Sequence, residues 1–110
     1  MAVSGCGRKI VAFRAVIVGC GSMAKGWIKA LQNTPELKGA VTIVGLVDLD
    51  PEAAKSLKAE FNLNDAALGE DLATVLRNTN ADILFDITVP AARRQCVLTG
   101  FAHGCHVLTE

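Results

Sequence analysis

Tyrosine is absent from the sequence, and aromatic residues make up only 5% of it. The core must therefore be built from aliphatic side chains, since hydrophobic residues amount to 51% of the chain. That composition favours helices packed on a buried sheet. Only 3 prolines and a mean hydropathy of +0.37 exclude a disordered chain, because enough apolar surface exists to offset the entropy lost on folding. The length of 110 residues fits one domain.

An excess of charge of either sign is also missing, because 11 Lys and Arg residues balance 11 Asp and Glu residues. Nucleic acids and anionic membrane surfaces attract clustered positive charge, so neither is predicted as a partner. No apolar run approaches the ~18 residues that a membrane-spanning helix requires.

The cysteines form no C-x-x-C pair and no disulfide framework spacing; they are Cys6, Cys20, Cys96 and Cys105. We interpret them as reduced, small apolar side chains of a cytoplasmic protein. Residues 8–20 imitate a lipoprotein signal that ends in a cysteine, but Arg14 interrupts the apolar stretch, so the cytoplasmic interpretation is preferred.

Short apolar runs alternate with amphipathic segments along the chain. Strands are expected at residues 15–18, 41–47, 66–68 and 83–88, with a fifth strand starting at 107–108. Helices are expected to begin at residues 22, 51, 72 and 90, and Val97, Leu98 and Phe101 are predicted to face inward in the last of them. Asp50 before Pro51 indicates a helix cap, and Gly104 marks the end of the fourth helix.

Continuously apolar strands indicate a parallel sheet covered on both faces. Right-handed crossovers then give an α/β fold with three layers, in which a doubly wound parallel sheet has the strand order 3-2-1-4-5.

A glycine-rich turn joins the first strand to the first helix. Residues 19–24 read Gly-Cys-Gly-Ser-Met-Ala, a G-x-G-x-x-A form of the dinucleotide fingerprint. Gly19 allows a sharp reversal, and Gly21 removes a side chain where a pyrophosphate must approach. The backbone amides of Ser22 and Met23 are free at the helix start, where the helix dipole favours an anion. The sequence therefore predicts a dinucleotide phosphate site here.

Asp48 supports this prediction, because it ends the second strand at the position where a ribose-binding carboxylate is expected. A carboxylate can accept hydrogen bonds from both ribose hydroxyls and repels a 2′-phosphate, and Leu49 offers no cation to bind one. NAD is therefore predicted in preference to NADP. Residues 5–7 have the same glycine spacing but no preceding strand, so they are not predicted to bind phosphate.

Other polar residues receive structural interpretations. Asp86 lies within an apolar strand, where a carboxylate is costly unless it is paired, and we expect it to meet a helix end rather than to line the crevice. Arg93 and Arg94 are interpreted as a solvated helix face, with contact between one arginine and a phosphate as the alternative.

His103, Cys105 and His106 are close in sequence, but they straddle a helix end and lack ligand spacing. No metal site is therefore predicted, and no residue of the chain is predicted to be catalytic.

Three segments together resemble the N-terminal NAD(P)-binding Rossmann domain of the Gfo/Idh/MocA oxidoreductase family, over about residues 13–110. They are the first turn at 18–23, the second strand with its acid at 44–51, and residues 103–110, which look like the approach to the family's Glu-Lys-Pro motif. The resemblance implies a dehydrogenase that transfers hydride between NAD and a sugar, polyol or related hydroxyl compound.

The resemblance also implies cofactor contacts at Thr88, Pro90 and Glu110. Many relatives carry a histidine where Arg93 stands. Because the sequence ends before the Lys-Pro that holds the family's catalytic lysine, residues 1–12 are expected to be an extension and residues 13–110 a cofactor domain truncated before a substrate domain. The chain alone is then expected to be inactive, to meet a small-molecule substrate only with that second domain, and to belong to a homo-oligomeric whole protein.

Two alternatives remain. One is a module that binds NAD without catalysis. The other is a methyltransferase-type domain for S-adenosylmethionine, although the usual G-x-G-x-G turn would need glycine at Met23.

Overall fold

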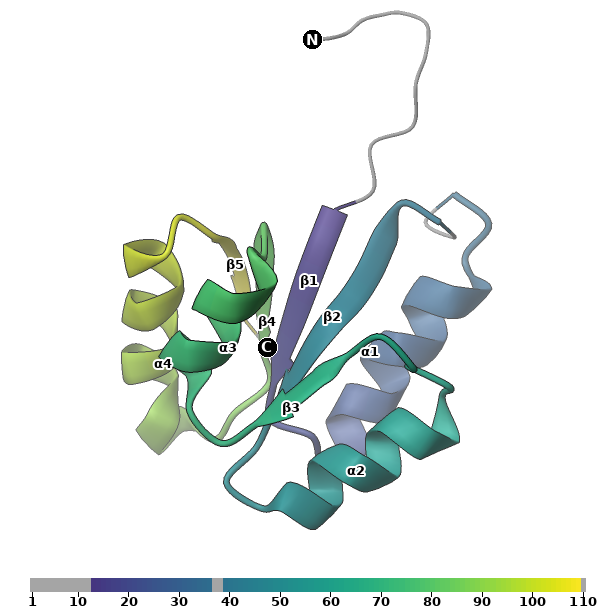
Figure 1. Cartoon of the computed structure of the whole chain (residues 1–110), viewed down its shortest axis with the longest axis horizontal. Coiled ribbons are helices and arrows are strands. Elements are labelled where there is room, and N and C mark those ends of the chain that lie inside the picture. Colours follow the sequence, from purple (N-terminus) through teal and green to yellow (C-terminus); the bar gives the residue numbers. More distant parts are fainter. Residues whose placement is uncertain (1–12, 37–38, 110) are drawn as a thin grey trace, which may run out of the picture.

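The computed structural model describes residues 13–36 and 39–109, in which five strands alternate with four helices (Figure 1). The strands are β1 (Phe13–Val18), β2 (Val41–Val47), β3 (Ala67–Gly69), β4 (Ile83–Asp86) and β5 (His106–Thr109). The helices are α1 (Ser22–Asn33), α2 (Pro51–Glu60), α3 (Leu72–Thr79) and α4 (Pro90–Ala102).

The strands form one parallel sheet in the order β3-β2-β1-β4-β5. This confirms the predicted α/β class, sheet and strand order. β1 is the central strand and pairs with β2 on one side and with β4 on the other. The chain therefore changes its direction of winding between β1 and β4, which is the topological switch point of a doubly wound sheet.

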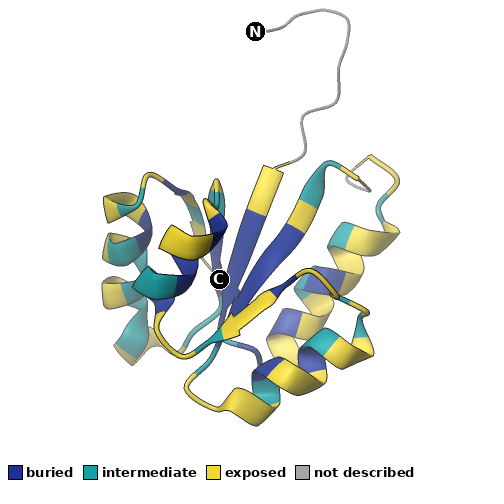
Figure 2. Ribbon diagram, in the orientation of Figure 1, coloured by how far each residue is buried: buried dark blue, intermediate teal, exposed yellow. Residues whose placement is uncertain are grey.

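The two faces of the sheet have separate apolar clusters. Ala15 and Ile17 of β1 face α1 and α2, whereas Val16 and Val18 face the side of α3 and α4. All four are buried, and Figure 2 shows the buried segments concentrated on β1 and β2. Because helices cover both faces, residues 15–18 of β1 form a continuous apolar run and not an alternating one.

Several predicted element ends are confirmed by their local contacts. The side chain of Asp50 accepts a hydrogen bond from the amide of Glu52 at 3.0 Å and so caps α2. Gly104 has a φ of +76° just after α4. The third strand begins one residue later than expected, and β4 ends at Asp86 instead of continuing to Thr88. β4 ends early because the carboxylate of Asp86 accepts a hydrogen bond from the amide of Thr88 at 3.1 Å, so this amide does not pair with a neighbouring strand.

The predicted inward face of α4 is wrong in part. Leu98 and Phe101 are 50% and 60% exposed. Gly100 instead contacts the sheet, where an added Cβ would lie 2.8 Å from side-chain atoms of both Leu84 and Val107. The absence of a side chain lets α4 sit close to β4 and β5, and this rotates the larger apolar residues away from the core.

Some expectations fall outside the described residues, namely the N-terminal extension at 1–12 and the role of Glu110. Within the described part of the chain, no helix is both long and apolar enough to cross a membrane. The cysteines that the structure describes, Cys20, Cys96 and Cys105, are free thiols.

Candidate cofactor site

Three loops meet at the carboxyl edge of the sheet, beside the switch point. They follow β1, β2 and β4 and carry Gly19, Asp48 and Thr88 respectively. In doubly wound sheets, ligands bind in the crevice outside this edge. The structure therefore brings the predicted residues of the first turn, the acid and Thr88 to one end of the molecule.

Gly19 is required by the backbone. Its φ is +96°, and an added Cβ would lie only 2.5 Å from the carbonyl oxygen of Ile87. Its amide donates to the carbonyl of Val47 at 2.8 Å. The turn after β1 is therefore held tightly against the segments that leave β2 and β4, and only glycine fits there.

Gly21 has a different environment. Its φ of −84° is open to any residue, and nothing lies within 4 Å of an added Cβ. Gly21 is the N-cap of α1 and provides no side chain to cap the helix. Between residues 13 and 36 and between 39 and 109, no hydrogen bond uses the amides of Ser22 or Met23. Open space beside free amides at a helix N-terminus fits a phosphate group.

Asp48 links two of the loops. One carboxylate oxygen, Oδ2, accepts from the amide of Cys20 at 2.7 Å, and Oδ1 accepts from the amide of Asp50 at 2.8 Å. A carboxylate has about four lone-pair positions, so acceptor capacity remains for ribose hydroxyls. The neighbouring Leu49 is 85% exposed and carries no charge, so it offers no partner for a 2′-phosphate.

Cys20 is buried behind the turn, with its Sγ 3.5 Å from the carbonyl oxygen of Val47. Burial, with a smaller contribution from the charge of Asp48, raises the pKa of this thiol to about 12. The thiol is therefore protonated at neutral pH and serves packing, as the sequence predicted.

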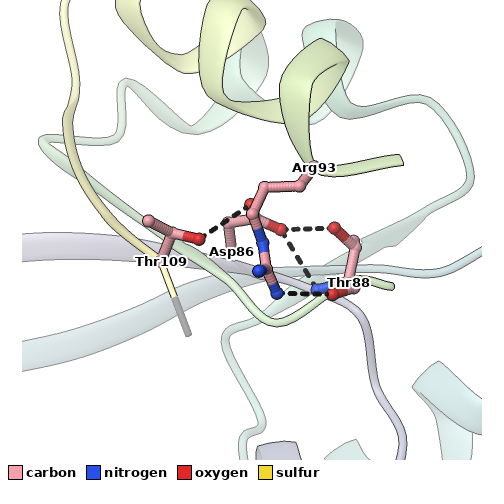
Figure 3. A network of polar contacts seen from close by, with 4 residues as sticks. All are labelled: Asp86, Thr88, Arg93 and Thr109. Carbon is pink, nitrogen blue, oxygen red and sulfur yellow. Dashed lines mark hydrogen bonds and ion pairs between the residues drawn. The ribbon is translucent and has the colours of Figure 1, made fainter. Parts of the chain in front are cut away.

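A polar network lies at the end of β4 (Figure 3). Asp86 is fully buried, and its Oδ1 accepts from both the amide and the hydroxyl of Thr88, at 3.1 and 2.5 Å. Its Oδ2 accepts from the hydroxyl of Thr109 at 3.3 Å. Because Asp86 and Thr109 are partners in the register of β4 and β5, this network joins the ends of two strands.

Arg93 completes the network, so its interpretation as part of a solvated helix face is wrong. Its Nη2 donates to the carbonyl of Thr88 at 2.9 Å, and its Nε lies 3.5 Å from Oδ2 of Asp86 without making a hydrogen bond. Arg94 is exposed, as expected. Asp86 is therefore paired, as its position demanded, but with residues of the crevice edge as well as with a helix. Sequence reasoning missed this pairing, although an aspartate within an apolar strand was a signal for it.

Thr88 and Pro90 follow β4 at the carboxyl edge, and the two histidines do not share this edge. Thr88 is half-buried and Pro90 is exposed at the start of α4, whereas Glu110 lies outside the described residues. His106 pairs with Ile83, the first residue of β4, and so lies at the opposite, amino edge of the sheet. Among the residues that the structure describes, no group of three or more His, Cys, Asp or Glu side chains is arranged to hold a metal ion.

Comparison with known proteins gives consistent results. Inositol 2-dehydrogenase/D-chiro-inositol 3-dehydrogenase of Lacticaseibacillus casei is 29% identical over 94 residues, which are 86% of this chain and 26% of that protein. Myo-inositol dehydrogenase from Lactobacillus casei, solved with NAD(H) and myo-inositol, superposes with a TM-score of 0.79 at 23% identity, over 90% of this chain and 28% of that one.

The WlbA dehydrogenase from Bordetella pertussis, solved with NADH and UDP-GlcNAcA, superposes with a TM-score of 0.77 at 25% identity, over 90% of this chain and 27% of that one. The chain thus spans about a quarter of the length of these relatives. Residues 13–110 match the GFO_IDH_MocA family, described as an oxidoreductase family with an NAD-binding Rossmann fold. The chain therefore belongs to the Gfo/Idh/MocA oxidoreductase family and forms its NAD-binding Rossmann domain.

Proposed function

We propose that this chain holds NAD across the carboxyl edge of its sheet, as the cofactor domain of a dehydrogenase that acts on a hydroxyl group of a sugar or polyol. The pyrophosphate would be held by Gly21 and the amides of Ser22 and Met23, and the adenosine ribose by Asp48. The other half of the cofactor would extend over Thr88 and Pro90.

The observation that carries the proposal is the open space at Gly21. This glycine has no conformational need to be glycine, because its φ is −84°, and no packing need, because nothing lies within 4 Å of an added Cβ. A free volume beside unpaired amides, next to a half-buried carboxylate, is what a dinucleotide requires.

The bound nicotinamide ring would supply the hydride acceptor or donor. The chain's own residues would bind and orient that cofactor: the first turn of α1 neutralises the phosphate charge, and Asp48 selects a free ribose. The substrate class is supported by the names of the relatives, which include inositol dehydrogenases. We also propose a cytoplasmic, homo-oligomeric whole protein whose substrate is held by a further domain. The cytoplasmic location is supported by the free thiols of the described cysteines.

Calorimetric titration of the chain with NAD, NADP and S-adenosylmethionine tests the proposal. We expect binding of NAD, weaker binding of NADP and no binding of S-adenosylmethionine. Preferential binding of S-adenosylmethionine would replace the proposal with a methyltransferase-type function, and binding of none of the three would refute it.

A further inference from the structure

The buried carboxylate of Asp86 lies at the crevice edge but is not one of the residues proposed to hold NAD. Asp86 is 0% exposed, and its ionic partner Arg93 has a side chain that is 32% exposed. A buried ion pair usually contributes little to stability, because the cost of removing both charges from water offsets their attraction. The four residues of the Asp86 network, which are Asp86, Thr88, Arg93 and Thr109, are therefore better explained by what they hold in place.

The contacts fix both the backbone and the side chain of Thr88. The carboxylate of Asp86 accepts hydrogen bonds from the amide and the hydroxyl of Thr88, and Arg93 donates one to the Thr88 carbonyl oxygen. All three polar groups of one residue are thus used to define its position. The hydroxyl proton points to Asp86, and the thiol of Cys96 also contacts this side chain. A remaining lone pair of the Thr88 oxygen can therefore accept a hydrogen bond, but the hydroxyl cannot donate one outward.

Thr88 also lies beside the glycine-rich turn. Its amide nitrogen would be 3.2 Å from a Cβ added at Gly19, so the two loops are adjacent. Asp48 lies on the other side of the turn, at the end of β2. With the pyrophosphate at α1 and the adenosine half directed to Asp48, the nicotinamide half has to pass over the ends of β4 and β5.

We propose that Asp86 and Arg93 are positioning residues for the nicotinamide half of NAD, which they serve by holding Thr88 as a fixed hydrogen-bond acceptor at the crevice edge. The carboxamide NH2 of nicotinamide is a donor of the kind that such an acceptor recognises. This inference rests on the proposed NAD site and adds a recognition element for one half of the cofactor.

The test compares two ligands that differ only at the nicotinamide. Dissociation constants for NAD and for ADP-ribose are measured on the wild-type chain and on the double variant Asp86→Asn/Arg93→Gln, which removes both charges and so avoids an unpaired buried one. We expect the preference for NAD over ADP-ribose to fall about 2- to 10-fold, the value of one hydrogen bond, while the affinity for ADP-ribose is retained.

Arg94→Gln is the matched control, because Arg94 is the exposed neighbour of Arg93, and it should leave the preference unchanged. Arg93→Lys keeps the charge but loses the planar fork, so it should lower the preference as well. Thermal melting of each variant confirms folding. An unchanged preference in the double variant and in Arg93→Lys, or an equal loss of affinity for both ligands, would overturn the inference. Failure of the wild-type chain to bind either ligand would instead refute the proposed NAD site, and the inference with it.

Discussion

The carboxylate of Asp48 accepts a hydrogen bond from the backbone amide of Cys20 at 2.7 Å, so the acid at the end of β2 and the glycine-rich turn form one unit. The same carboxylate accepts from the amide of Asp50 at the start of α2. Asp48 therefore orients the glycine-rich turn with one oxygen, and in the proposed function its remaining lone pairs would accept hydrogen bonds from a ribose. A change at Asp48 should affect both.

Asp48→Asn tests both roles together. The amide offers one acceptor where the carboxylate offered two, so the backbone amide of Cys20 or of Asp50 loses its partner. We expect NAD affinity to fall by about 1–3 kcal/mol. NADP should lose less affinity or gain some, because removal of the charge relieves repulsion of its 2′-phosphate. Titration with both cofactors measures the change in selectivity, and Asp50→Asn serves as the control, since asparagine also caps helices well. An equal loss for both cofactors would assign Asp48 a structural role only.

The two glycines of the turn should respond in opposite ways. Gly21→Val should abolish NAD binding but preserve the fold, because its φ of −84° accepts a side chain that then fills the phosphate space. Gly19→Ala should destabilise the fold, because its φ is +96° and the methyl group would lie 2.5 Å from a carbonyl oxygen. Circular dichroism during thermal unfolding separates the two effects, and titration with NAD completes the comparison.

Gly26→Ala is the control for these glycine variants, because Gly26 lies within α1 and also has nothing within 4 Å of an added Cβ. It should stabilise the chain by about 0.5–1 kcal/mol through helix propensity and leave NAD binding unchanged. Normal NAD binding by Gly21→Val would show that the turn is not the phosphate site.

Much of the fold could be predicted because local signals agreed with the global pattern. Residues 15–18 of β1 and 43–47 of β2 carry no polar side chain, and Asp50 before Pro51 marks the start of a helix. The inward face of α4 could not be predicted, because Gly100 gives no hydrophobic signal although it makes the close contact with the sheet. A buried helix face is predicted from the spacing of large apolar side chains. A glycine has no side chain, so this spacing cannot identify it as the contact residue.

The same reasoning applies to the site. The geometry supports the predicted roles of Gly19, Gly21 and Asp48, which remain predictions. They could be predicted from the sequence because these residues belong to one known sequence pattern. The Asp86–Arg93 pair joins residues of a strand and a helix through a buried contact of 3.5 Å. Such a pairing depends on how α4 packs against the sheet. The sequence shows only that a carboxylate lies within an apolar strand, and it does not show which residue pairs with it.

The buried thiol of Cys20 should lower the free energy of unfolding at alkaline pH. The pKa of its thiol is raised from 9.0 to about 12 in the folded chain, so stability is fully present below pH 9 and is lost as pH rises toward 12. In that window the unfolded chain releases a proton that the folded chain retains, which costs about 1.4 kcal/mol per pH unit. Urea unfolding at increasing pH should therefore give a steeper decline for the wild type than for Cys20→Ala. Parallel profiles for the two proteins would contradict the prediction.

Neither histidine of the chain should act as a general base for a substrate that is bound next to the nicotinamide ring. His106 begins β5 and pairs with Ile83, and the strand then runs about 10 Å before it reaches the carboxyl edge. His103 ends α4 at the same distant edge and is held by the carbonyl of Thr99 at 2.9 Å. General base catalysis requires hydrogen-bond reach of the substrate hydroxyl, which neither side chain has.

The 110-residue chain should therefore bind NAD but produce no NADH when it is incubated with a panel of sugars and polyols. Hydride transfer requires a substrate held in line with the nicotinamide as well as a base, and the described residues offer no histidine for that purpose at the cofactor edge. His103→Ala and His106→Ala should leave NAD affinity unchanged, since both positions lie away from the crevice. The absorbance of NADH measures turnover directly. Steady production that disappears in either histidine variant would show that a histidine reaches the substrate, and would refute this assignment of the two edges.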